Sequence, residues 1–206
     1  TRYLGGKGVV CEKTDYYSWL LLNSLGTTKG KQGTLVAELF KFRELHKANA
    51  PLDAVFPQLA KDFPARYKGM GLADHCREMH AYIREHALVE TMVEASRIIP
   101  DQALVPAQAY RAIVKKNVEF VRIDSLDPVR DPRVSAVMVV PYPPGIPLMM
   151  GGEAINEKSR PILEYLRARQ DFENSVPGYA SDIHGIDRTT TDAEGRRYYE
   201  IMVIKH

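Results

Sequence analysis

The chain has 206 residues, of which 45% are hydrophobic, so it can bury one large core or two small ones. Its 28 basic and 26 acidic residues leave a formal net charge of only +2, which argues against a nucleic-acid or membrane partner. The two cysteines, Cys11 and Cys76, form no CxxC pair and indicate neither a disulfide framework nor a zinc ribbon. No stretch approaches the roughly 18 to 20 apolar residues of a membrane helix. We therefore expect a globular protein of the reducing cytoplasm.

The first half of the chain predicts two strands packed on helices. Residues 8–12 and the apolar segment 18–23 are interpreted as the strands. Helical spacing of apolar side chains predicts three helices, over residues 34–49, 52–63 and 71–99. The last of these is expected to break near Ala87 and Leu88. Residues 1–103 are therefore predicted to form an α+β unit.

The second half continues the α+β pattern and is expected to form a second domain over residues 104–206. Its predicted elements are a helix over 107–116, strands over 118–123 and 137–140, a helix ending near residue 174, and a strand over 198–204. Asn156 or Ser159 can cap the second helix. A hairpin-like turn over residues 192–195 leads into the last strand.

A proline-rich stretch follows the apolar residues 137–140. Four prolines stand in the seven positions 141–147. Each proline fixes its own φ and biases the preceding residue toward an extended conformation. The stretch is therefore predicted to be a short buried strand running into a rigid turn, which holds Tyr142 and Glu153 in defined places and suits the wall of a site.

Five segments, spread over nearly the whole chain, resemble the C-terminal part of the bacterial ornithine/lysine/arginine decarboxylases. They are Val-Cys-Glu-Lys-Thr at 10–14 with Tyr-Ser at 17–18, Pro-Tyr-Pro-Pro-Gly-Ile-Pro at 141–147, Arg-Pro-Ile-Leu-Glu-Tyr-Leu at 160–166, Pro-Gly-Tyr at 177–179 and Asp-Ile-His-Gly at 182–185. Members of this family use pyridoxal phosphate on an aminotransferase-like fold. The resemblance implies that residues 1–103 are the small subdomain of that fold and residues 104–206 the decarboxylase C-terminal domain.

The resemblance also implies a role for Glu12, since the matching glutamate of the family lies close to the substrate pocket. A fixed carboxylate there could pair with the distal ammonium or guanidinium group of a basic amino acid. The pattern alone leaves open a simpler interpretation, in which Glu12 is an edge-strand acid held by Lys13 or by solvent.

Tyr142 and Glu153 are the other two substrate-binding candidates implied by the family. The matching tyrosine borders the substrate channel, where its ring can pack on a methylene stem and its hydroxyl can hydrogen-bond. Tyr142 could equally be packed between prolines, and Glu153 could cap the helix that begins near Asn156. The family usually has Pro-Gly-Glu where this chain has Gly151-Gly152-Glu153, which weakens the case for Glu153.

Two further clusters favour structure over chemistry. His75 and His80 are five residues apart, which does not place two ligands on one helical face, so no metal is expected although Cys76 and His80 share a face. Asp182 and His184 alternate on an extended segment and could form an acid/base pair or a structural hydrogen bond. The structural interpretation is preferred.

The chain lacks the sequence motif with which the family binds its cofactor, pyridoxal phosphate. Pyridoxal phosphate needs a lysine, an acid at its pyridine nitrogen and donors for its phosphate. In the family the lysine sits in a Ser-x-His-Lys motif of the large domain, and no lysine here has that setting. No residue of this chain is therefore expected to bind the cofactor, and the chain alone should be inactive.

The hypothesis from the sequence is the C-terminal part of a decarboxylase that converts arginine, lysine or ornithine into a polyamine precursor and CO2. Its opening on Thr1, within what the family suggests is an internal helix, indicates a fragment. The expected partners are the basic amino-acid substrate, the remainder of the enzyme and further subunits in a homodimer or decamer, and an isolated chain should self-associate. The alternative is a freestanding, non-catalytic binding or regulatory domain descended from that half.

Overall fold

A computed structural model describes residues 1–142 and 145–205. Pro143 and Pro144, which the sequence places in the rigid turn, lie outside the described residues. The chain forms two compact units, Thr1–Glu85 (unit 1) and His86–His206 (unit 2). In the described part of the chain, no helix combines the length and apolar character needed to cross a membrane. The fold is mixed, with both helices and small sheets, as the sequence predicts.

Unit 1 begins with a short helix and a two-stranded hairpin. Helix α1 spans Arg2–Gly5, and the antiparallel strands β1 (Lys13–Thr14) and β2 (Trp19–Leu20) pair Lys13 with Leu20 and Thr14 with Trp19. The prediction of a strand over residues 8–12 is wrong. Gly8 has φ +77° and makes a turn, and Val10 is 82% exposed, so these apolar residues find no strand partner.

Five helices complete unit 1, namely α2 (Lys29–Lys47), α3 (Leu52–Val55), α4 (Pro57–Asp62), α5 (Pro64–Tyr67) and α6 (Leu72–Glu85). Helix α2 starts five residues earlier than predicted because the Thr28 hydroxyl accepts a hydrogen bond from the Lys31 N–H and caps it. Asn49 ends α2 in the left-handed region and its side-chain oxygen accepts from the Ala73 N–H at 2.9 Å. One asparagine thus ends one helix and starts another.

The described residues of unit 2 form three small antiparallel sheets. Strand β9 (Glu200–Ile204) lies between β3 (Val118–Arg122) and β8 (Ile186–Asp187), while β4 (Arg133–Val134) pairs with β6 (Ala154–Ile155). The third sheet pairs β5 (Val140–Tyr142) with β7 (Asp182–His184). We call this third sheet the β5–β7 ribbon.

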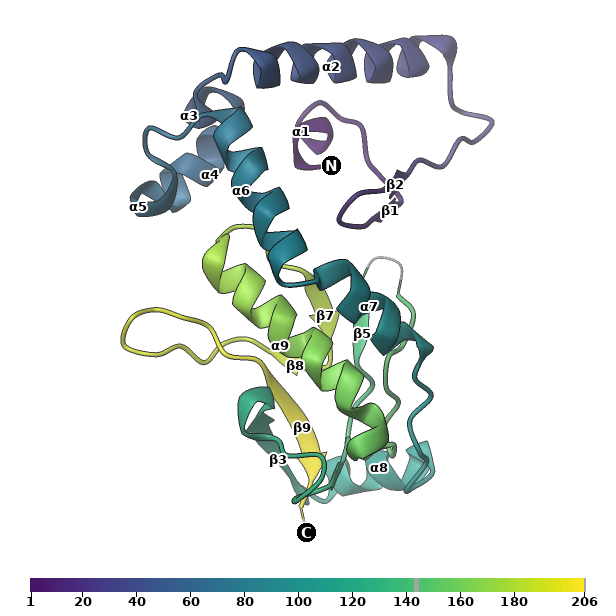
Figure 1. Cartoon of the computed structure of the whole chain (residues 1–206). Helices are drawn as coiled ribbons and strands as arrows, with labels where there is room; N and C mark the ends of the chain where they lie inside the picture. Colours follow the sequence, from purple (N-terminus) through teal and green to yellow (C-terminus); the bar gives the residue numbers. More distant parts are fainter. Residues whose placement is uncertain (143–144, 206) are drawn as a thin grey trace. The chain divides into compact units, whose positions relative to one another are not determined.

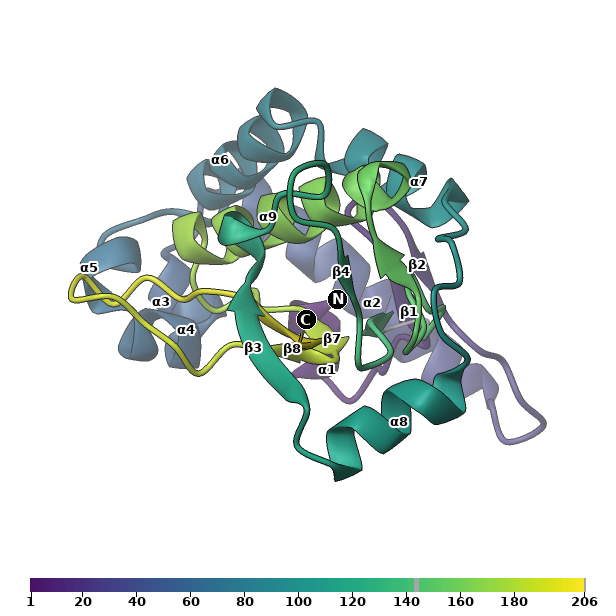
Figure 2. The same ribbon diagram turned by 90° about the horizontal axis from the view of Figure 1, so that it is seen from below.

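The helices of unit 2 are α7 (Leu88–Arg97), α8 (Pro106–Val114) and α9 (Arg160–Ser175), with short 3₁₀ turns η1 (Ile123–Ser125) and η2 (Glu157–Ser159). Helix α9 lies across the strands of unit 2 and α7 runs beside it (Figures 1 and 2). Because α7 packs along α9, the compact units divide between residues 85 and 86, whereas the sequence places the boundary between 103 and 104.

The core of unit 2 lies where α9 faces the sheets. Ile162, Leu163 and Leu166 are each 1% exposed, and they pack with buried strand residues such as Ile201 and Val203. The predicted cap is confirmed, since the Asn156 side chain accepts from the Lys158 N–H and the Ser159 hydroxyl accepts from the Asn156 N–H. The packing of these core residues thus holds α9 against the strands of unit 2.

The predicted strand over residues 137–140 is displaced toward the C-terminus. Val139 and Val140 are buried, but Met138 is 45% exposed and the strand that pairs with β7 runs from Val140 to Tyr142. Pro141 can join this strand because β5 pairs with a single neighbour, so its missing N–H interrupts no second ladder. The proline therefore lies within the strand that it was expected to end.

Candidate functional site

The β5–β7 ribbon brings three polar side chains together at the surface of unit 2. Tyr142 pairs with Asp182 in the strand register, and Val140 pairs with His184. The rings of Tyr142 and His184 meet edge to face, with 6.2 Å between centroids. The His184 Nε2 lies 3.4 Å from an Asp182 carboxylate oxygen. Asp182 and His184 share one face of β7, as the alternation predicts.

All three side chains are more than half exposed, at 56% for Tyr142, 60% for Asp182 and 62% for His184. The cluster therefore offers an aromatic face, a carboxylate and an imidazole to a ligand. A carboxylate beside an aromatic face suits a cationic group, which the carboxylate attracts electrostatically and the ring through its quadrupole. An exposed pair of this kind contributes little to stability, since water screens it.

Gly185 fixes the far end of the ribbon. It has φ +84°, and a Cβ built there would lie 2.1 Å from the Met138 carbonyl oxygen. A residue with a side chain would have to push this backbone away and strain its own conformation. The glycine thus allows the chain to pass directly against the segment that leads into Tyr142.

Glu153 holds a turn. Its carboxylate accepts a hydrogen bond from the Met150 N–H at 2.7 Å, while its own N–H donates to the Met150 carbonyl at 3.1 Å. The alternative that Glu153 caps the helix near Asn156 is wrong, because Asn156 itself supplies that cap. The neighbouring Gly152 has φ +96° and lies so close to the Leu104 carbonyl that a Cβ would be 2.2 Å from it. Glycine is therefore required at this turn.

Glu12 belongs to unit 1 and directly precedes β1. Its backbone N–H donates to the Leu20 carbonyl at 2.9 Å, which extends the hairpin by one hydrogen bond. Its side chain is exposed, and no hydrogen bond or ion pair joins its carboxylate to another residue of the described chain. Lys13 does not pair with it, so the carboxylate is available to a partner.

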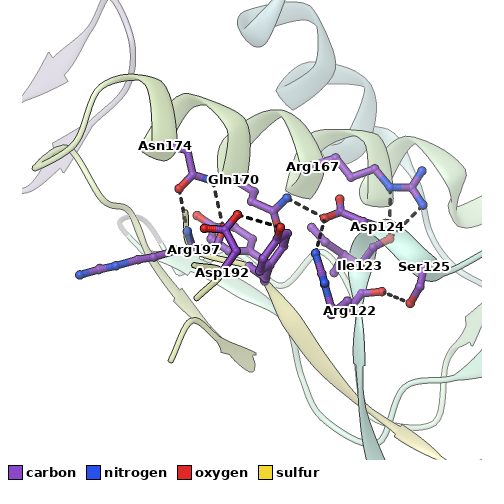
Figure 3. A network of polar contacts seen from close by, with 11 residues as sticks. Arg122, Ile123, Asp124, Ser125, Arg167, Gln170, Asn174, Asp192 and Arg197 are labelled. Carbon is purple, nitrogen blue, oxygen red and sulfur yellow. Dashed lines mark hydrogen bonds and ion pairs between the residues drawn. The ribbon is translucent and has the colours of Figure 1, made fainter. Parts of the chain in front are cut away.

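A second polar network, which the sequence analysis missed, anchors loops of unit 2 to α9 (Figure 3). The Gln170 amide donates to Asp124 at 2.9 Å and accepts from the Tyr199 N–H at 2.7 Å. Asn174 exchanges two hydrogen bonds with the backbone of Arg197, both at 2.9 Å. These bonds tie η1 and the last hairpin to one helix, and no sequence motif signals them.

A hollow of about 450 Å³ adjoins this network, between η1 and the first turns of α9. Its two arginines are already engaged. Arg167 donates to the carbonyls of Ile123 and Leu126, and Arg160 pairs with Glu157 at 2.5 Å. Acidic side chains, among them Asp127 and Glu164, also line it, so the hollow does not form a dedicated anion site.

The histidines of α6 have separate roles in unit 1. His75 is 1% exposed and packs edge to face on Tyr67 at 5.3 Å. Burial, together with the nearby positive charge of Arg66, lowers the pKa of His75 to about 4. His80 instead accepts or donates a hydrogen bond with the Tyr17 hydroxyl at 2.9 Å. Among the described residues, no three His, Cys, Asp or Glu side chains are grouped so as to hold a metal ion.

The residues of this chain do not fit a pyridoxal phosphate site. Every lysine is exposed, whereas a lysine that binds this cofactor covalently needs a sheltered pocket. Lys47 follows a histidine, as in Ser-x-His-Lys, but Glu44 stands at the serine position. Lys47 lies on the exposed surface of α2, 3.5 Å from that glutamate. The cofactor of the family would have to be held by residues outside this chain.

Comparison with known proteins shows to which family this chain belongs. The sequence profile described as "Orn/Lys/Arg decarboxylase, C-terminal domain" matches residues 87–205, which is more than half of the chain, and the match begins one residue after the start of unit 2. The chain belongs to the Orn/Lys/Arg decarboxylase family. Lysine decarboxylase LdcA of Pseudomonas aeruginosa is 43% identical over 205 residues, and the biodegradative arginine decarboxylase of Escherichia coli is 37% identical over 205 residues.

Both relatives are much longer than this chain, and the match to each covers all of this chain (100%) but only 26% of the relative. The solved structure of lysine decarboxylase A from Pseudomonas aeruginosa superposes with a TM-score of 0.87 at 43% identity, again over 99% of this chain and 26% of that one. This chain therefore spans about a quarter of the length of the relatives that it matches.

Proposed function

We propose that this chain is the C-terminal part of a pyridoxal-phosphate-dependent decarboxylase that acts on a basic amino acid. The observation that carries the proposal is the match to the lysine and arginine decarboxylases over the full length of this chain. The reaction would release CO2 and leave the diamine or amine that serves as a polyamine precursor. We favour lysine or arginine as the substrate, because these are the substrates named for the relatives that are 43% and 37% identical.

In the complete enzyme, this chain would form part of the wall of the substrate channel. Tyr142 supports this role because its ring is 56% exposed on a strand that Gly185 holds against its neighbour. Glu12 supports it because its carboxylate is exposed and unpaired within the described chain. Glu153 is assigned to holding its own turn, since its carboxylate already accepts from the Met150 N–H.

The chain would also supply contacts to the rest of the enzyme and to other subunits. None of the residues of α2, all of which the structure describes, is buried, and its apolar side chains Val36 and Phe40 are 51% and 54% exposed. On α8, Tyr110 and Val114 are 66% and 63% exposed. Exposed apolar side chains on this scale are typical of surfaces that a partner covers. We propose that unit 1 is the small aminotransferase-like subdomain of the enzyme.

The cofactor, pyridoxal phosphate, would be bound by the large domain that this chain lacks. Within this chain, Tyr142 and Glu12 would each supply a contact for the distal cation of the substrate, whereas Glu153 would not. The isolated 206-residue chain is accordingly expected to have no decarboxylase activity.

The test is the steady-state kinetics of the full-length decarboxylase with lysine, arginine and ornithine. Tyr142→Ala and Glu12→Gln should each raise KM about ten-fold for the preferred substrate while kcat stays within about two-fold, as expected when a ground-state binding contact is removed. Phe120→Ala removes a comparably exposed aromatic ring from β3, 52% exposed, and should leave KM unchanged. An unchanged KM in both test variants would refute the channel role.

A further inference from the structure

Three atoms of Ser181, the residue immediately before β7, are held by charged side chains. Its N–H donates to a carboxylate oxygen of Glu173 at 2.6 Å. Its hydroxyl accepts from the Arg169 guanidinium, and its carbonyl accepts from the Arg188 guanidinium. Arg188 also lies 3.7 Å from Glu173, which closes the group. We call Arg169, Glu173, Ser181 and Arg188 the Ser181 clamp.

Two charged residues of the clamp, Arg169 and Glu173, are buried, while Ser181 and Arg188 are half-buried. Arg169 is 7% exposed and Glu173 is 8% exposed, and both project from the side of α9 that faces the core. The hydroxyl of Tyr199 lies beside Glu173, and burial together with that carboxylate raises the pKa of Tyr199 well above its usual value. Removing charges from water costs free energy that hydrophobic residues would not cost. The burial of the Arg169 and Glu173 charges therefore calls for an explanation other than stability alone.

The position of the Ser181 clamp in the fold supplies such an explanation. The clamp fixes the backbone at the residue next to Asp182, and Asp182 pairs with Tyr142 across the ribbon. At the opposite end of β7, Gly185 lies against the Met138 carbonyl. The ribbon is thus fastened at both ends of β7, by buried charges on α9 at one end and by a close backbone contact at the other.

We propose that the Ser181 clamp positions Tyr142 and the Asp182–His184 pair for substrate, and that Glu173 is its central positioning residue. This inference rests on the proposed function, because it presumes that Tyr142 faces the substrate channel. The clamp residues do not touch substrate themselves. They act through the register of the ribbon, since a shift of Ser181 moves Asp182 and with it the strand partner of Tyr142.

The experiment compares three variants of the full-length decarboxylase. Glu173→Gln keeps the size of the side chain and an oxygen for the Ser181 N–H but removes the charge that holds Arg188. Glu119→Gln is the control, because Glu119 pairs with Arg133, a 9% exposed arginine of β4, which is not a strand of the ribbon. Ser181→Ala removes one of the three clamp contacts and leaves the two backbone contacts in place.

Glu173→Gln is expected to raise KM about five-fold or more with kcat within about two-fold, whereas Glu119→Gln should change neither. Ser181→Ala should give a smaller rise. In hydrogen exchange, the amides of residues 181–184 should exchange about ten-fold faster in Glu173→Gln than in the parent protein, while those of β9 keep their protection.

The double variant Glu173→Gln with Tyr142→Ala separates positioning from general weakening. If the clamp acts through Tyr142, the double variant should have the KM of Tyr142→Ala alone, because the positioned side chain is already absent. Additive increases, or a normal KM in Glu173→Gln when Tyr142→Ala raises it, would overturn the clamp inference and leave the proposed function standing. A normal KM in Tyr142→Ala would instead refute the role proposed for Tyr142, and the clamp inference would fall with it.

Discussion

Acidification should destabilise unit 1 through His75. The side chain is 1% exposed, and its pKa is about 4 in the folded unit against 6.5 as the ordinary value. The lowered pKa means that the unfolded chain binds more protons than the folded unit between these values. The stabilisation is therefore complete above pH 6.5 and is lost as the pH falls toward about 4.

The magnitude follows from the two pKa values. Each factor of ten in proton affinity corresponds to 1.36 kcal/mol, so the full difference is about 3 kcal/mol, of which about 2 kcal/mol is lost by roughly pH 5. The variant His75→Phe keeps a ring against Tyr67 and removes the titration. Its free energy of unfolding should fall about 2 kcal/mol less than that of the parent chain over this pH range.

The assay is urea denaturation at about pH 7.5 and pH 5, followed by the fluorescence of Trp19, which is the only tryptophan and lies in unit 1. The control is Leu59→Val, which changes a buried residue of α4 that does not titrate and should leave the pH dependence of the parent chain unchanged. If the parent chain and His75→Phe lose the same free energy on acidification, the burial of a neutral His75 does not govern the acid stability of unit 1.

Three further predictions concern stability and association. Gly71→Ala should destabilise unit 1 by about 1–3 kcal/mol in urea denaturation, since its Cβ would lie 2.1 Å from the Asn49 side chain that caps α6. Gly33→Ala, on α2 with open space around it, should not destabilise the unit. An equal loss of stability in both variants would contradict the steric argument. Gln170→Leu should cost unit 2 about 1–3 kcal/mol by leaving the buried Tyr199 N–H unpaired, and a neutral effect on the denaturation midpoint would refute this. The isolated chain should sediment as a self-associating species, and a monodisperse monomer at high concentration would contradict the exposed apolar surfaces described above.

Helix boundaries that depend on local chemistry could be predicted from the sequence. The break near Ala87 is confirmed by its left-handed φ of 47°, and Asn156 caps the turn before α9 as expected. The hairpin turn near residues 192–195 is also confirmed, with Asp192 accepting from the Arg196 N–H and φ +78° at Gly195. In each case the residues that determine the geometry are within a few positions of one another.

Features that depend on distant partners could not be predicted. Residues 8–12 have the composition of a strand, but strand formation needs a partner, and the hairpin pairs the following residues instead. Met138 lies among buried valines yet points outward, because the ribbon register begins two residues later. Glu173 and Gln170 look like ordinary polar positions of a surface helix, and only the fold shows that they are buried and bonded.

The central claim is that this chain works as the C-terminal quarter of a decarboxylase. The most direct measurement is the intact mass of the protein from its source, taken together with the visible absorbance of enzyme-bound pyridoxal phosphate. We predict a chain, or a companion chain, several times heavier than 23.3 kDa that carries this absorbance and releases CO2 from lysine or arginine. A colourless species of 23.3 kDa without a companion would contradict the account and would favour a freestanding domain.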